Sequence, residues 1–257
     1  MQFSFPPHRI AVNMPDRTAL LAEVGRRLAA GQGFALATIN LDHLVKLRRD
    51  PVFAAAYAAQ DLVVADGNPV VWLSRLARRP VALVPGSELV VPLARQAAQA
   101  GVAVALVGST APALAAAATA LQAQVPGLRV AACIAPPMGF DPDSPQAGAL
   151  LDELGASGAR LVFLALGAPK QERLAARGRV ALPQTGFASV GAGLDFLAGT
   201  QVRAPVWVRR IAMEWLWRML SNPRRLARRY AECALILPGQ AVSAWQLRDD
   251  SGKPENR

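Results

Sequence analysis

The sequence predicts an α/β protein: a Rossmann-like, open and mainly parallel sheet flanked by helices, followed by a basic helical appendage at the C-terminus. Three observations support this fold class. Short apolar runs alternate with segments long enough for helices, the runs are continuously apolar, and several of them end in glycine or a small polar residue. Continuous apolar strands separated by helices are typical of a parallel sheet that is covered on both faces.

Six apolar runs are predicted as strands, at residues 35–39, 62–65, 102–107, 128–134, 161–166 and 188–190. Between them, residues 42–59, 89–99 and 113–124 are predicted to be helical. Thr110 is expected to cap the helix at 113–124, with Pro112 in its first turn. Residues 96–128 carry no charge, but glycines and prolines interrupt them, so we predict a strand and a helix there and no membrane-spanning segment.

The character of the chain changes after residue 197, so we predict an α/β domain over residues 1–197 and an appendage over residues 198–257. The net charge is +10, and residues 203–229 hold eight arginines and one acidic residue, Glu214. Apolar residues recur at helical spacing over 208–219, and a second basic helix is predicted to begin at Arg224. Clustered cations bind phosphate groups of nucleic acid, anionic lipid or a diphosphate substrate.

The composition excludes several classes of protein. Hydrophobic residues make up 53% and charged residues 18% of the chain, which is not the composition of a disordered protein. Cys133 and Cys233 form no CxxC pair, so neither a zinc site nor a disulfide framework is indicated. The opening residues lack the pattern of a signal peptide. The sequence also contains neither a GxGxxG dinucleotide fingerprint nor a GxxxxGK[ST] phosphate loop.

Asp66 is the first candidate site residue. It directly follows the apolar run 62–65 and precedes Gly67, which permits a tight turn. In an open parallel sheet the carboxyl ends of the strands form the ligand crevice, so Asp66 is expected to lie there. The alternative is that Asp66 begins a turn and caps the next helix.

Lys170, Gln171 and Glu172 form a second candidate group, because they begin a predicted helix directly after a strand that ends in Gly-Ala-Pro. A helix N-terminus that carries Lys and Gln suits a phosphate group or sugar hydroxyls, although an ordinary helix start fits equally well. Asp141 and Asp143 resemble a metal-binding DxD pair, but the surrounding prolines favour a surface turn. His43 has no second histidine at ligand spacing, so we interpret it as structural.

Taken in order, the motifs resemble the WecG/TagA/CpsF glycosyltransferases (glycosyltransferase family 26), over about residues 10 to 230. The motifs that carry the resemblance are Thr38-Ile-Asn40, Ala65-Asp-Gly67, Pro85-Gly-Ser-Glu-Leu89, Gly167-Ala-Pro-Lys-Gln-Glu172, Val190-Gly-Ala-Gly-Leu-Asp195, Arg203-Ala-Pro205, Glu214-Trp-Leu-Trp-Arg218 and Pro223-Arg-Arg-Leu-Ala-Arg228. Each motif is weak alone, but the ordered set is specific.

The resemblance implies roles for individual residues. Asp66 matches the general base of the family, Thr38 and Asn40 match residues near the sugar, and Gln171 matches the glutamine of the PKQE-like motif. Gly108 and Asp195, in strand-end motifs, are expected to contact the donor nucleotide. The appendage of the family supplies arginines to the active site, and the residues at that spacing are Arg218, Arg225 and Arg228. Leu83 stands where many members have an arginine, so Arg78 or Arg79 is a candidate substitute, or the donor sugar differs.

The resemblance also implies the reaction and its partners. We expect an inverting transfer from a UDP-sugar to a sugar on polyprenyl diphosphate, at the cytoplasmic face of the membrane. Arginines, which bind phosphate oxygens in pairs, are expected to stabilise the departing diphosphate without a metal ion or other cofactor. Tryptophans among the arginines, at positions 207, 215 and 217, suit an anionic membrane surface.

Two rival interpretations remain at this point. One is a non-catalytic module whose basic tail binds phosphate, nucleic acid or anionic membrane, since Trp and Arg also interleave in nucleic-acid-binding proteins. The amphipathic period at 208–219 and the strand-end motifs favour the enzyme, and we expect no nucleic-acid partner. The other rival is a nucleotide-dependent hydrolase in which Asp66 activates water.

Overall fold

The predicted fold class is confirmed by the computed structural model, which describes residues 1–201, 205, 217 and 223–248. Its centre is a six-stranded sheet with the order β4-β3-β8-β7-β5-β6, in which every neighbouring pair is parallel. The strands are β3 (Phe34–Ile39), β4 (Leu62–Ala65), β5 (Val104–Gly108), β6 (Val130–Ile134), β7 (Leu161–Ala165) and β8 (Gly186–Ser189). Each lies within two residues of the run that predicted it.

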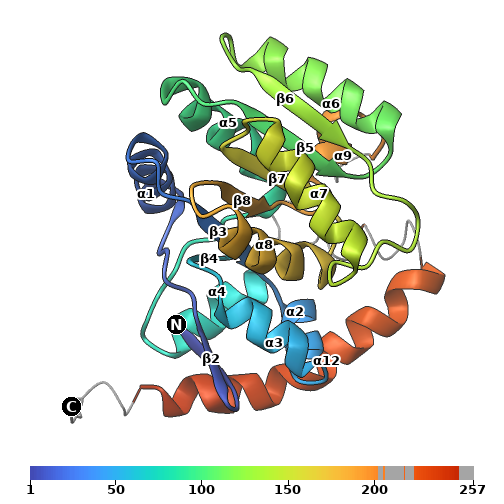
Figure 1. The fold of residues 1–257 in the computed structure, drawn as a ribbon. Helices are drawn as coiled ribbons and strands as arrows, with labels where there is room; N and C mark the ends of the chain where they lie inside the picture. The colour runs from blue at the N-terminus through green and yellow to red at the C-terminus, as the bar shows by residue number, and fades with distance from the viewer. Residues whose placement is uncertain (202–204, 206–216, 218–222, 249–257) are drawn as a thin grey trace.

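Helices cover both faces of this sheet (Figure 1). They are α1 (Arg17–Ala29), α2 (Leu41–Leu47), α3 (Pro51–Ala58), α4 (Asn68–Leu76), α5 (Val90–Gln99), α6 (Ala111–Gln124), α7 (Pro145–Ala156), α8 (Lys170–Ala181), α9 (Gly193–Leu197) and α12 (Pro223–Gln246), with a short 3₁₀ turn, η1 (Gly86–Glu88). The helices α1, α5 and α6 pack on one face, and α7 and α8 pack on the other.

The predicted helix ends are largely confirmed. Thr110 caps α6 by accepting a hydrogen bond from the backbone N–H of Ala113, and Pro112 lies in the first turn. The segment predicted as helical over 42–59 is two helices, because Asp50 caps a new helix that has Pro51 at its first position. An aspartate followed by proline is a strong helix start, so it divides the segment.

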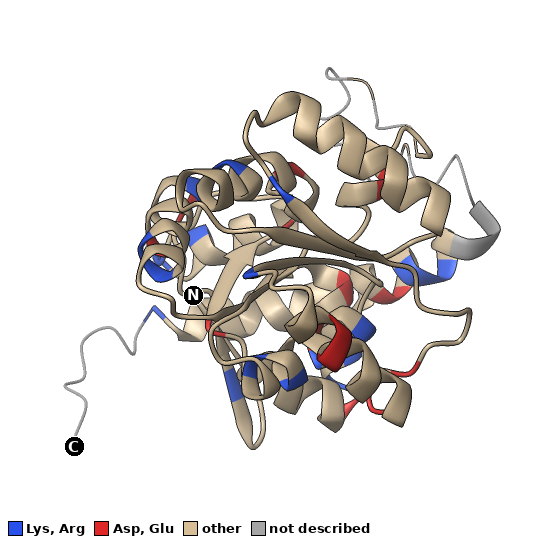
Figure 2. Ribbon diagram, turned by 45° about the horizontal axis from the view of Figure 1, so that its top comes forward, with Lys and Arg blue, Asp and Glu red and all other residues tan. Residues whose placement is uncertain are grey.

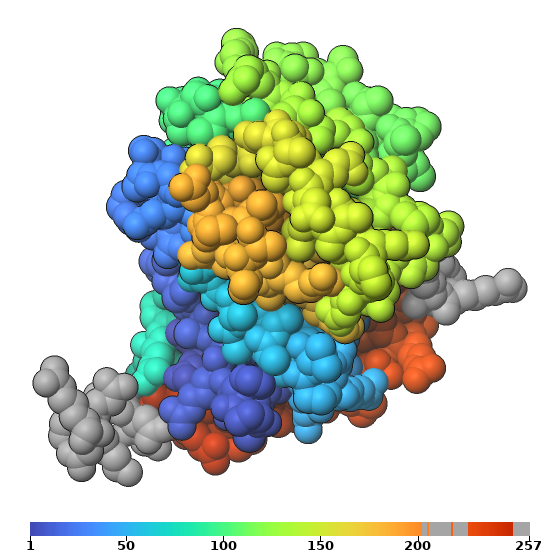
Figure 3. Space-filling model, viewed as in Figure 1, coloured from blue at the N-terminus to red at the C-terminus, as the bar shows by residue number. Residues whose placement is uncertain are grey.

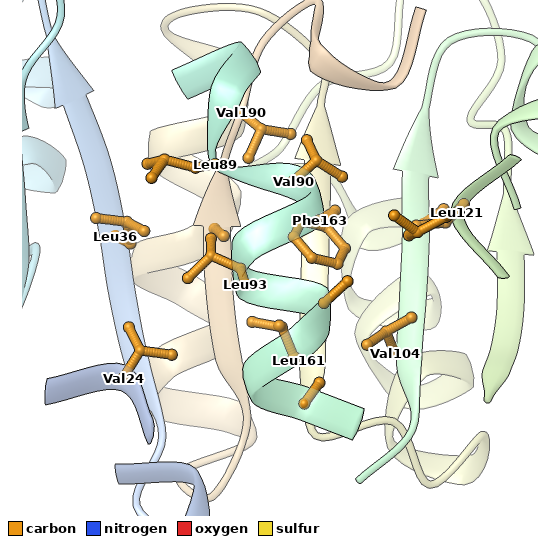
Figure 4. Close-up of a cluster of buried hydrophobic side chains, with 14 of the residues drawn as sticks. Val24, Leu36, Leu89, Val90, Leu93, Val104, Leu121, Leu161, Phe163 and Val190 are labelled. Atoms are coloured by element: carbon orange, nitrogen blue, oxygen red, sulfur yellow. The ribbon is translucent and has the colours of Figure 1, made fainter. Parts of the chain in front are cut away.

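Alternation along the strands separates the apolar cores. Leu36, Val104, Leu161 and Phe163 point toward α1 and α5, where they meet Leu93 and other helical side chains (Figure 4). The next residues along β5 and β7 point to the opposite face, where a second core lies under α7 and α8. Both faces are apolar because both are covered, which explains the continuous apolar runs in the sequence.

A third core lies at the β4 edge, and the sequence did not reveal how it is built. A hairpin of β1 (Gln2–Phe5) and β2 (His8–Ala11) packs there with α2, α3 and α4. The long helix α12 packs on the same cluster through Ala244, which is fully buried, and neighbours such as Ile236 and Leu237. In Figures 1 and 3, α12 runs along the lower margin of the molecule, where it packs against α2 and α4.

The start of α12 confirms the prediction of a basic helix near Arg224. The amphipathic segment at 208–219 lies outside the described residues, except for Trp217. None of the described helices combines the length and apolarity needed to cross a membrane.

Candidate active site

The connections between strands run in opposite directions from the centre of the sheet, at the edge formed by the carboxyl ends of the strands. From β3 the chain crosses outward to β4, whereas from β5 it crosses the other way to β6. The connections therefore diverge above β8 and β7, which lie between these pairs. In open α/β sheets this divergence marks the usual ligand crevice, so the residues that follow β3, β4, β7 and β8 are the candidates for an active site.

Asp66 lies at this edge and is held by the neighbouring strand. Its backbone N–H donates to the carbonyl oxygen of Ile39 at 2.7 Å, which extends the pairing of β4 with β3 by one step. Gly67, the N-cap residue of α4, has φ +109° and supplies no capping side chain. The N-cap position of α4 belongs to Gly67, so the capping half of the alternative is wrong, whereas the half in which Asp66 begins a turn stays a prediction.

Asn40 and Thr38 lie beside Asp66 at the end of β3. The Asn40 side-chain oxygen accepts from the backbone N–H of His43 at 3.1 Å and caps α2, so the amide N–H groups take no part in that bond. Thr38 is 4% exposed and lies under Gly86, where an added Cβ would come within 2.9 Å of the threonine hydroxyl oxygen. The structure thus brings Thr38, Asn40 and Asp66 together, as the motifs predicted.

The segment that carries Leu83 runs along the open side of β4. Leu83 bridges Ala65, and the N–H of Val84 donates to the carbonyl oxygen of Ala65 at 2.8 Å. Arg78 and Arg79 follow the far end of α4, about 13 Å from its start at 1.5 Å per helical residue. The geometry therefore favours neither of them as a substitute for an arginine at position 83.

Gln171 connects the start of α8 to the loop after β8. The Gln171 side chain, 3% exposed, accepts from the backbone N–H of Gly191 at 3.3 Å and donates to the Glu172 carboxyl at 2.8 Å. The Glu172 side chain is fully buried, and burial raises its pKa to about 7. Glu172 belongs to the predicted candidate group with Lys170 and Gln171, but the complete burial of its carboxyl group was not predicted.

A buried polar pair lies behind these residues. The hydroxyl of Tyr57 and Nδ1 of His43 are 3.2 Å apart, and both side chains are buried. Burial, together with the nearby charges of Glu172 and Asp66, raises the pKa of Tyr57 well above its usual value. Burial lowers the pKa of His43 to about 3, so this imidazole is neutral and its predicted structural role is supported.

Gly108 and Asp195 meet at the end of β5, apart from the group around Asp66. An added Cβ on Gly108 would lie 2.4 Å from the carbonyl oxygen of Ala165, so close strand packing already explains this glycine. The hydroxyl of Ser109 donates to the Asp195 carboxylate at 2.5 Å, and Gln201 donates to its other oxygen at 3.1 Å. Ser109 has φ +50°, a conformation that this hydrogen bond helps to hold.

The structure describes the appendage arginines unevenly. Arg218 and the side chain of Arg225 lie outside the described residues. Arg228 is 87% exposed and pairs with Glu232 of its own helix at 3.3 Å, so its guanidinium is not brought to the strand ends. The following residue, Arg229, pairs instead with Asp42 at the start of α2 at 3.1 Å. Figure 2 shows this basic beginning of α12 next to acidic segments.

Two hollows and the DxD pair lie outside the groups described so far. A hollow of about 310 Å³ opens at the carboxyl edge between α5 and α9, lined by Ser87, Glu88, Val90, Val91, Gly193, Phe196 and Leu197. A larger hollow of about 610 Å³ lies at the opposite edge, near Val130 and Gly158, away from every predicted site residue. Asp143 pairs with Arg173, and no cluster of three potential metal ligands occurs among the described residues.

Comparison with known families shows what kind of enzyme the chain is. The model of the glycosyl transferase WecG/TagA/CpsF family matches residues 7–249, nearly the whole chain. The chain belongs to this family. It is therefore a glycosyltransferase, which acts on a sugar donor and an acceptor. The resemblance that the motifs carried is confirmed, and the strand-end group around Asp66 becomes the candidate active site of a sugar transfer.

Proposed function

We propose that this protein transfers a hexose or N-acetylhexosamine from a UDP-sugar to a sugar carried on polyprenyl diphosphate, with inversion at the anomeric carbon. The product would enter an exopolysaccharide or another cell-surface polysaccharide. The observation that carries the proposal is the position of Asp66. Its backbone is fixed to Ile39 at the end of β3, beside Asn40 and Thr38, on the edge where open α/β sheets bind their ligands.

In this mechanism Asp66 is the general base. An ionised carboxylate at the strand end accepts the proton of the acceptor hydroxyl while that oxygen attacks the anomeric carbon and UDP departs. A single displacement of this kind inverts the anomeric centre and needs no second carboxylate as nucleophile. Asn40 would orient the sugar through its amide N–H groups, since its side-chain oxygen is already committed to α2.

Arginines of the appendage would neutralise the charge that develops on the departing diphosphate, so that no metal ion is required. Guanidinium groups bind phosphate oxygens in pairs and stay charged at all relevant pH values. Arg218 and Arg225 are the candidates. The contact of Arg229 with Asp42 supports this role, because it places the start of α12 next to the helix that Asn40 caps.

The acceptor places the enzyme at the inner surface of the cell membrane, and α12 has a face that suits contact with lipid. Leu235, Val242 and Trp245 are 80%, 59% and 56% exposed. No charged residue occurs between Glu232 and Arg248. An apolar exposed stripe that follows a basic segment is typical of a helix that lies in a membrane interface.

Product analysis tests the reaction. The protein is incubated with a panel of UDP-sugars and a polyprenyl-diphosphate monosaccharide, and the product's mass and linkage are determined. We expect a disaccharide on the lipid carrier, and UDP release that depends on acceptor. UDP release at the same rate without acceptor would favour hydrolysis instead. A chain that releases no UDP and forms no product with any donor would contradict the proposal.

Vesicle sedimentation tests the membrane contact. Leu235→Asp with Val242→Asp should weaken binding to anionic vesicles, because two charges enter the apolar stripe. Gln122→Asp on α6, an exposed position far from α12 in the sequence, is the matched control and should bind like the unaltered protein. Equal binding of all three proteins would remove α12 from the membrane contact.

A further inference from the structure

Glu172 is a fully buried carboxyl group directly behind the strand-end site. It lies in the first turn of α8, and its side chain has no exposed surface. Oε1 accepts the hydrogen bond from Gln171, whereas Oε2 has no hydrogen-bond partner among the described residues. An ionised carboxylate in this position is strongly disfavoured, because nothing replaces the water that Oε2 has lost.

The Gln171 amide links this carboxyl group to the loop after β8. Its nitrogen donates to Glu172, and its oxygen accepts from the N–H of Gly191. Glutamine amides can be turned by half a rotation, which exchanges oxygen and nitrogen. An acceptor on one side and a donor on the other select one orientation. Glu172 and Gly191 together therefore determine which way the amide oxygen and nitrogen of Gln171 face.

Among the residues that the structure describes, most charged groups that face Glu172 are paired. Lys46 and Asp42 of α2 pair with each other at 2.9 Å, and Lys46 also donates to the carbonyl oxygen of Ala168. From α3, Tyr57 is protonated and Gln60 donates to the backbone carbonyl of Glu172 at 3.1 Å. Arg173, next along α8, pairs with Asp143. Burial raises the pKa of Glu172 to about 7 against the opposing hydrogen bond from Gln171 and the charge of Lys46.

We propose that Glu172 is a positioning residue: in its neutral form it holds the Gln171 amide, and through it the Gly191 loop, in the arrangement that binds the donor, and its ionisation disrupts that arrangement. An ionised Glu172 has to draw in water or move toward Lys46, and either change breaks the chain of contacts to Gly191. The role in donor binding rests on the proposed function, whereas the contact between Gln171 and the Gly191 loop is a property of the free protein.

Nuclear magnetic resonance of the free protein tests the hold on the loop without any substrate. The backbone amide of Gly191 and the side-chain amide of Gln171 are followed from pH 5.5 to pH 8.5. In the unaltered protein both signals should titrate together, with a midpoint near 7. In Glu172→Gln, which keeps the acceptor oxygen and never ionises, they should stay at their low-pH positions. Glu153→Gln, at an exposed position of α7, is the matched control and should titrate like the unaltered protein.

Flat signals in the unaltered protein would overturn the proposal whether or not the variant folds. An unchanged titration in Glu172→Gln would overturn it as well, since another group would then be responsible.

Kinetics test the consequence for donor binding. Above pH 7 the KM for the donor should rise in the unaltered protein by up to about tenfold per pH unit, as expected for one ionisation, with a smaller change in kcat. Glu172→Gln should lose this rise. Loss of activity in Glu172→Gln at every pH would show that the carboxylate itself is required. A protein that transfers no sugar leaves the magnetic resonance result standing, so failure of the proposed function is distinguishable.

Discussion

Arg229 of α12 forms an ion pair with Asp42 of α2, with 3.1 Å between Nε and Oδ1. Asp42 lies just beyond Asn40, which caps the same helix from the end of β3. Its second oxygen pairs with Lys46, which in turn donates to the carbonyl oxygen of Ala168 before α8. One carboxylate thus connects the C-terminal helix to two segments that carry candidate site residues.

A double-mutant cycle on Asp42→Asn and Arg229→Gln should therefore show coupling in the free energy of unfolding. We expect about 1 kcal/mol, since the pair is only partly shielded from water. The side chains are 11% and 34% exposed. Urea unfolding of the four proteins measures the coupling. The pair Arg228–Glu232 is the control: Arg228 is 87% exposed, and its coupling should be close to zero. Equal coupling in both cycles would argue against a special role for Asp42.

Asp66→Asn should reduce turnover by about 10²–10⁴-fold while UDP binding persists, because the amide keeps the shape of the carboxylate and cannot accept the proton. Initial rates with saturating donor and acceptor measure the first effect, and calorimetry with UDP measures the second. Asp61→Asn, at the other end of β4, is the control. Asp61 pairs with Arg27 and Arg179, so its loss should lower stability and leave turnover nearly unchanged. Normal turnover in Asp66→Asn would exclude it as the base.

Gly108→Ala should destabilise the fold, whatever this glycine contributes to nucleotide binding. The new methyl group would meet the carbonyl oxygen of Ala165, and φ is +117°, so both sterics and backbone conformation oppose alanine. We expect a loss of about 1–3 kcal/mol, measured by urea unfolding. In contrast, Gly239→Ala in α12 meets nothing within 4 Å and should stabilise the protein by about 0.5–1 kcal/mol. A neutral Gly108→Ala would show that the strands can separate at this point.

The strands could be predicted closely because burial on both faces leaves continuous apolar runs. The strand β8 begins at Gly186, two residues before the predicted run. Glycine is not typical of a strand, so this start was not predicted, although Gly186 packs against the ring of Phe34. The strand-end residues Thr38, Asn40 and Asp66 were predictable for a related reason. Parallel pairing brings the ends of neighbouring strands together, so sequence position alone implies proximity.

Contacts that depend on how a helix docks were not predictable. The motif spacing pointed to Arg228, whereas the structure places Arg229 on α2, and one residue turns a side chain by about 100° around the helix. The burial of Glu172 was not predictable either, because it depends on how α3 and α8 pack together. The hairpin β1–β2 was missed because its short strands are stabilised by contacts with α3 and neighbours far along the chain.

The pH dependence of stability should reveal two buried groups that act in opposite directions. His43 has its pKa lowered from 6.5 to about 3, so its contribution to stability is complete above pH 6.5 and is lost as the pH falls. Glu172 has its pKa raised from 4.5 to about 7, so its contribution is complete below pH 4.5 and is lost as the pH rises. Between pH 4.5 and 6.5 the two slopes, each about 1.4 kcal/mol per pH unit, nearly cancel.

Each single variant should then expose the slope of the other group. In His43→Gln, whose side-chain oxygen can still accept from the Tyr57 hydroxyl, the free energy of unfolding should fall as the pH rises from 4.5 to 6.5. In Glu172→Gln it should rise over the same interval, and the double variant should be nearly flat, like the unaltered protein. Urea unfolding at half-unit pH steps measures all four curves. Parallel curves would mean that neither group changes its protonation on unfolding, because a slope requires the folded and unfolded chains to bind different numbers of protons.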